Sequence, residues 1–214
     1  LLDEHPELLN ACHRNGGSVL YAAASQGLHT LVKELLDRGA DHRHLTPSGA
    51  SPLDGAVHNV RGRNRPTNEG CLIAAGLLLQ AGCETSLKTA VALGDRDLVR
   101  QYHQREPERF VNDGTRQVGL LHLAVNNNDL EMVQLLLELG CHPDDRHKLL
   151  EYETKPDSLG KPLAAATGNG RHAIAEVLLE AGADPNASLY ASGTPVTHAW
   201  NNKDEEMKGL LLRY

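Results

Sequence analysis

The chain has 214 residues, a formal net charge of −7 and only 3% aromatic residues. The acidic balance argues against nucleic acid as the main partner, because nucleic acids are recognised through a basic surface. No apolar run approaches the roughly 18 residues of a membrane span, and no signal peptide is found, so we expect a cytoplasmic protein without a membrane partner. With so few rings, a core of Leu, Ala and Val at many equivalent places favours stacked repeats over one compact globule.

An apolar anchor residue, followed three residues later by a small apolar residue, recurs along the chain. The anchors are Leu20, Leu53, Leu87, Leu121, Leu163 and Val196, with spacings of 33, 34, 34, 42 and 33 residues. A leucine-rich run follows most anchors and ends at a glycine, as at Leu35, Leu36 and Gly39. This pattern predicts two short helices per unit, the second of which ends where glycine adopts the left-handed conformation.

In chain order, residues 1–16 resemble the end of an earlier unit, and Tyr102–Asn112 echoes them with Pro107 near the usual position of glycine. The second unit carries an insertion at residues 59–70 and lacks the loop that normally follows, so the period is preserved. A long linker follows the fourth unit. We expect one domain, residues 1–214, which belongs to a longer protein and consists of a partial repeat (1–16) and repeats 17–49, 50–84, 85–116, 117–158, 159–191 and 192–214, the last truncated.

These landmarks resemble the ankyrin-repeat family. Its T-P-L-H-x-A-A segment is matched at Thr194-Pro195 and by His122, and its L-L-L-x-x-G-A-D-x-N segment is matched at Ala183–Asn186. The resemblance implies an all-α solenoid of stacked helix-turn-helix units with hairpin-like loops. It also implies that a partner binds at the loop tips and on the concave face, at the two residues that follow each small pair.

Several polar residues occupy these expected binding positions: Gln26, His58, Asn59, Asn126, Asn127, Asn169, Asn201 and Asn202. Two interpretations of the recurring amides are open. Asn tolerates the turn at the end of a short helix, or the amides line a groove that hydrogen-bonds an extended peptide or a polar ligand.

Two further groups are candidates for contact with a partner. Arg61, Arg63 and Arg65 in the insertion either bind an acidic or phosphorylated partner or form a solvated loop. Trp200, with Tyr190 and His198 nearby, is either an aromatic anchor for a partner or packing at the end of the last repeat.

We find no motif for catalysis, nucleotide binding or a structural metal, and we expect no cofactor, no metal site and no enzymatic activity. An Asp54–His58 pair at i, i+4 is a solvated pair more readily than a catalytic one. We therefore expect a protein-interaction module, monomeric by default, that binds a protein or peptide as part of a larger scaffold or effector. The alternatives are a targeting arm for an enzyme domain outside this sequence, and a ligand-binding or catalytic ankyrin variant that uses the groove.

Overall fold

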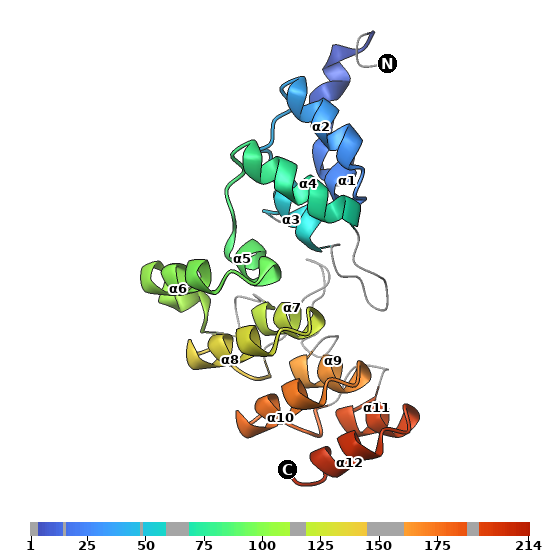
Figure 1. Ribbon diagram of the computed structural model, residues 1–214, viewed down its shortest axis with the longest axis vertical. Coiled ribbons are helices and arrows are strands. Elements are labelled where there is room, and N and C mark those ends of the chain that lie inside the picture. The colour runs from blue at the N-terminus through green and yellow to red at the C-terminus, as the bar shows by residue number, and fades with distance from the viewer. Residues whose placement is uncertain are drawn as a thin grey trace. The chain divides into compact units, whose positions relative to one another are not determined.

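The computed structural model describes residues 4–14, 16–47, 49–58, 69–111, 119–144, 161–187 and 193–214, with only the backbone at His58. Within these ranges the regular elements are all helices, and isolated bridge residues occur at Cys12, Ser18 and Gly193, the first two paired in antiparallel fashion. The predicted all-α class is confirmed. The chain divides into two compact units, Leu1–Leu93 and Gly94–Tyr214, whose helices are labelled in Figure 1 and which are described one at a time.

The first unit contains the 3-10 helix η1 (Pro6–Asn10) and the α-helices α1 (Val19–Ser25), α2 (His29–Asp37), α3 (Pro52–His58), α4 (Glu69–Gln80) and α5 (Leu87–Leu93). Helix α3 packs between α1 and α5, while α4 packs against α2 and α3. The core between them includes Leu20, Val32, Leu35, Leu53 and Leu78, each at most 1% exposed. Each helix pair thus buries its apolar face against the next pair, because one pair alone cannot bury it.

The second unit contains α6 (Arg96–Arg105), η2 (Pro107–Arg109), α7 (Leu120–Asn126), α8 (Leu130–Glu138), α9 (Pro162–Gly168), α10 (His172–Glu180), α11 (Pro195–Asn201) and α12 (Glu205–Leu211). The first helices of the pairs stack as α7, α9 and α11, and the second helices stack as α8, α10 and α12. Leu121, Leu136, Leu163 and Leu178 are among the fully buried side chains. The two segments that echo each other in sequence form η1 and η2, each opened by a proline.

The helix starts follow from local chemistry. A side-chain oxygen accepts a backbone N–H of the first turn at Ser18, Asp95, Asp129, Thr194 and Asp204. Such caps stabilise a helix by about 1 kcal/mol each because they satisfy an otherwise unpaired donor. Proline opens α3, α9 and α11, where its missing N–H removes no hydrogen bond.

The turn between the two helices of a pair requires a residue with positive φ. Gly170 takes this position in one repeat (64°), but Asn128 (55°) and Lys203 (56°) take it in two others. The second helices α2, α4, α8 and α10 are followed by a glycine with positive φ, for example Gly39 (84°) and Gly140 (98°), as the sequence predicts, whereas α6 is followed by Glu106. No helix in the described part of the chain is long and apolar enough to span a bilayer.

Candidate partner-binding site

The predicted amides lie where the first helix of each pair ends. Gln26 follows α1 in the first unit, and Asn127, Asn169 and Asn202 follow α7, α9 and α11 in the second. Each donates its backbone N–H to carbonyls of the last helical turn. We call Asn127, Asn169 and Asn202 the helix-end row, since they occupy one position in successive repeats of the second unit.

The side chains of Asn169 and Asn202 bond to carbonyls at helix ends. Asn169 Nδ2 donates to the Ala165 carbonyl at 2.7 Å, within its own helix. Asn202 Nδ2 lies 3.4 Å from the Gly168 carbonyl of the preceding repeat. Asn126 Oδ1 is buried and has no hydrogen-bond partner among the described residues. Helix-end chemistry thus accounts for one bond each at Asn169 and Asn202, and leaves the Asn126 oxygen as an unused acceptor.

Arg171 joins the start of α10 to the end of α7 in the preceding repeat. It precedes α10, and its guanidinium donates to the carbonyls of Val125 and Asn126, the latter at 2.9 Å. Both carbonyls lie at the end of α7, and that of Val125 also accepts the Asn128 N–H at 2.9 Å. Burial lowers the pKa of Arg171 from its ordinary value. Sequence reasoning missed this contact, which spans 45 residues of chain.

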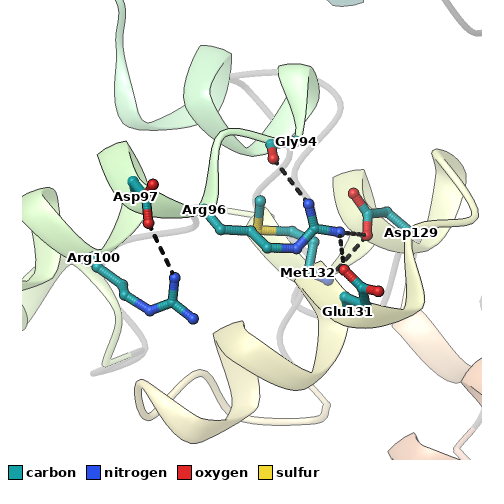
Figure 2. A network of polar contacts seen from close by, with 7 residues as sticks. All are labelled: Gly94, Arg96, Asp97, Arg100, Asp129, Glu131 and Met132. Carbon is teal, nitrogen blue, oxygen red and sulfur yellow. Dashed lines mark hydrogen bonds and ion pairs between the residues drawn. The ribbon is translucent and has the colours of Figure 1, made fainter.

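A second joint links α6 to the start of α8 (Figure 2). Arg96 Nη2 lies 2.7 Å from Asp129 Oδ1 and 2.9 Å from Glu131 Oε2, while Nη1 donates to the Gly94 carbonyl at 3.1 Å. Asp129 also caps α8 by accepting the Met132 N–H. One carboxylate therefore caps its own helix and holds the preceding repeat.

The same arrangement recurs between α10 and α12 with a histidine in place of the arginine. His172 Nε2 lies 2.9 Å from both oxygens of Asp204, which caps α12 through the Met207 N–H. The Met207 N–H, followed by the bond from His172, holds the pKa of Asp204 below its ordinary value. Sequence alone offers one signal for these joints: an Asp helix cap that lies 32 or 33 residues after a His or Arg at the start of a second helix.

Trp200 lies in α11 and is 66% exposed. Lys208 Nζ lies over the Trp200 ring in a cation–π contact, 4.3 Å from the ring centroid. The same Nζ lies 2.7 Å from Glu205 Oε1. The residues at the equivalent position of earlier repeats are all buried: Ala24, Val57, Val91, Val125 and Thr167. His198, on the same helix, has a buried Nε2 with no hydrogen-bond partner in the described ranges.

Asp54 ties α3 to the start of α5. Its Oδ1 accepts the hydroxyls of Ser86, at 2.6 Å, and Thr89, and its Oδ2 accepts the hydroxyl and N–H of Ser51, each at 2.9 Å. Burial is the largest influence and raises its pKa, but the bonds from Ser86, Thr89 and Ser51 together hold the pKa below the ordinary 3.8. One oxygen thus joins α3 to the next repeat, and the other holds the start of α3 itself.

The remaining candidates fall outside the described residues. These are Asn59, Arg61, Arg63, Arg65 and Tyr190, together with the side chain of His58. Asn201 ends α11 and is exposed.

Helix pairs that stack first helix on first helix and second on second, with glycine ends and proline starts, define an ankyrin-type repeat protein. Residues 87–188 match the family model described as ankyrin repeats (3 copies). The chain is 26% identical over 192 residues to an ankyrin repeat protein of fowlpox virus (strain NVSL), FPV014, and the match covers 85% of the chain and 39% of that protein's length. The crystal structure of the ankyrin repeat domain of Bcl-3, a member of the IkappaB family, shares the fold: 22% identity, TM-score 0.50, 100% of this chain and 89% of that chain.

The fold is therefore an all-α ankyrin solenoid, and residues 87–188 match ankyrin repeats in sequence. Ankyrin repeats generally mediate protein–protein interaction.

Proposed function

We propose that the protein binds an extended segment of a partner protein along the helix-end row, as part of a larger scaffold or effector. The observation that carries this proposal is the recurrence of asparagine at one position in three successive repeats: Asn127, Asn169 and Asn202. Termination of the helix does not by itself require asparagine, since Leu93 and Gln26 occupy the same position in other repeats. A row of carboxamides is chemically suited to the alternating N–H and C=O groups of an extended backbone.

The bonds within the row leave capacity for such a partner. A carboxamide has two N–H donors and an oxygen with two lone pairs. Asn169 uses one N–H on Ala165, and Asn202 makes one long contact of 3.4 Å.

Exposed aromatic surface next to the row supports the same proposal. Trp200 is 66% exposed and lies two residues before Asn202. Tryptophan anchors are over-represented among the side chains that dominate binding energy. The adjacent Asn201 is also exposed.

The test is a selection of short random peptides displayed on phage against the immobilised protein, followed by affinity measurement with purified peptides. We expect the double variant Asn127→Ala, Asn202→Ala to weaken binding of the selected peptides by at least about tenfold, or about 1.4 kcal/mol. The matched control is Gln104→Ala, Gln134→Ala, which removes two exposed amides from the second helices α6 and α8.

Circular dichroism of each variant checks that the helices are retained. Equal affinity of the selected peptides for the wild type and the Asn127, Asn202 variant would refute the proposed site. A loss of the same size in the Gln104, Gln134 control would also refute it, since the effect would then not depend on the row.

A further inference from the structure

The surroundings of the helix-end row limit the conformation of a bound segment. The regular elements in the described part of the chain are helices, so no strand edge there can pair with the backbone of a partner. A helical partner would instead need apolar side chains to receive its apolar anchors. The exposed residues that adjoin the row in sequence have none: Asn128, Gly168, Gly170, Asn201 and Lys203.

The row offers side-chain N–H donors. Asn169 Nδ2 donates to the Ala165 carbonyl at 2.7 Å, and Asn202 Nδ2 lies 3.4 Å from the Gly168 carbonyl. A carboxamide has two N–H donors, so each of these two side chains keeps one for a carbonyl of the partner. A partner N–H that turns toward the helices and misses a row oxygen loses its bond to water without a replacement. Proline removes that cost, because it has a carbonyl but no N–H.

The spacing of the row favours one extended conformation over another. Helices α7, α9 and α11 pack in this order, and packed helices lie about 8–10 Å apart, so the row presents one amide at about that interval. Groups on one side of a β-strand recur every two residues, or about 6.7 Å. In a polyproline II helix they recur every three residues, or about 9.3 Å. The second period matches the row and the first does not.

We propose that the segment bound along the helix-end row is a proline-rich segment in the polyproline II conformation, with proline at every third residue. This inference rests on the proposed function and names the class of its partner. A polyproline II helix has no internal hydrogen bonds, so its carbonyls are available to the row amides. It is also largely preformed, which lowers the entropy lost on binding. Six residues rise about 19 Å, enough to extend from Asn127 to Asn202.

The test compares two phage libraries of 12-residue peptides selected against the immobilised full chain. One has the framework Pro-x-x repeated four times, and the other is random but free of proline. We expect the first library to yield peptides whose affinity falls at least about tenfold in Asn127→Ala, Asn202→Ala. The affinity should stay unchanged in the control variant Gln104→Ala, Gln134→Ala, whose substituted side chains are exposed on second helices. Circular dichroism again checks that both variants keep their helices.

A change of register separates the period from the proline content. One alanine inserted after the second Pro-x-x triplet of a selected peptide keeps all four prolines but moves half of them to another side of the helix. We expect this insertion to weaken binding at least about tenfold. Unchanged affinity would overturn the three-residue period. Peptides from the proline-free library that depend on the row and bind as tightly would overturn the polyproline II partner but leave the proposed site standing. If neither library yields peptides that depend on the row, the proposed site fails as well.

Discussion

Asp54 offers a quantitative test of how the first unit is held together. Asp54→Asn keeps the shape of the side chain but replaces one accepting oxygen by an N–H₂ donor. The hydroxyls of Ser86 and Thr89, or the N–H and hydroxyl of Ser51, then lose their acceptor. A hydrogen bond to a charged group contributes about 1.5–3 kcal/mol. Because Ser86 Oγ and Thr89 Oγ1 are 3.0 Å apart and can bond each other, the net loss is about 2 kcal/mol.

The assay is urea unfolding followed by circular dichroism, with hydrogen exchange read locally in α3 and α5. At neutral pH we expect Asp54→Asn to lose about 2 kcal/mol of unfolding free energy. The control is Asp97→Asn, whose side chain is 91% exposed and pairs with Arg100 at 3.4 Å; it should change stability by less than about 0.5 kcal/mol. Unchanged stability and exchange in Asp54→Asn would refute the structural role of this carboxylate.

The pH dependence follows from the lowered pKa of Asp54. The folded state favours the carboxylate, so its stabilising effect is fully present above the unfolded pKa, near 3.8, and is lost as the pH falls through the folded pKa. The difference between the wild type and Asp54→Asn should therefore stay constant from pH 7 to about 5 and shrink below about 4. A difference that grows on acidification would contradict the assigned shift.

Three further changes test the second unit. Asn128→Gly should stabilise the protein by about 0.5–1 kcal/mol in urea unfolding, because glycine adopts the left-handed turn without strain. Arg171→Met should destabilise it by about 2 kcal/mol and speed hydrogen exchange at the end of α7, since two carbonyls lose a charged donor. A double-mutant cycle on Trp200→Val and Lys208→Ala should give a coupling of about 0.5–1 kcal/mol. A destabilised Asn128→Gly, an unchanged exchange in Arg171→Met, or a coupling near zero would contradict the respective argument.

The repeat skeleton could be predicted from the sequence because it depends on local signals. Leu20 and Leu163 lie at a fixed distance before Gly39 and Gly182, and both the buried anchors and the left-handed helix ends are where the period places them. Each of these features, a buried helix face or a residue with positive φ, is determined by one short segment. It can therefore be predicted without knowing how neighbouring repeats pack.

The polar joints between repeats could not be predicted in the same way. Arg171 donates hydrogen bonds to carbonyls at the end of α7, and Asp54 accepts hydrogen bonds from hydroxyls of the following repeat. Either residue taken alone looks like a solvated surface charge. Their partners lie more than 30 residues away in sequence and become evident only when the helices are stacked. The asparagine row was found by sequence, but the bonds of Asn169 and Asn202 to helix ends depend on geometry that spacing does not contain.

The last repeat differs from the others at two positions that contact each other. Where the second helices of the other repeats carry the buried residues Val32, Ala75, Val99, Val133 and Ala175, α12 carries Lys208. Where the first helices carry small or β-branched buried residues, α11 carries Trp200, and the two side chains meet in a cation–π contact with Glu205 as counter-ion. Without Lys208 the Trp200 ring would lose its cation, and without Trp200 the ammonium would keep only Glu205 as a partner. The pair therefore gives the Lys208 ammonium both a ring and a carboxylate as partners, while the Trp200 side chain remains 66% exposed on α11.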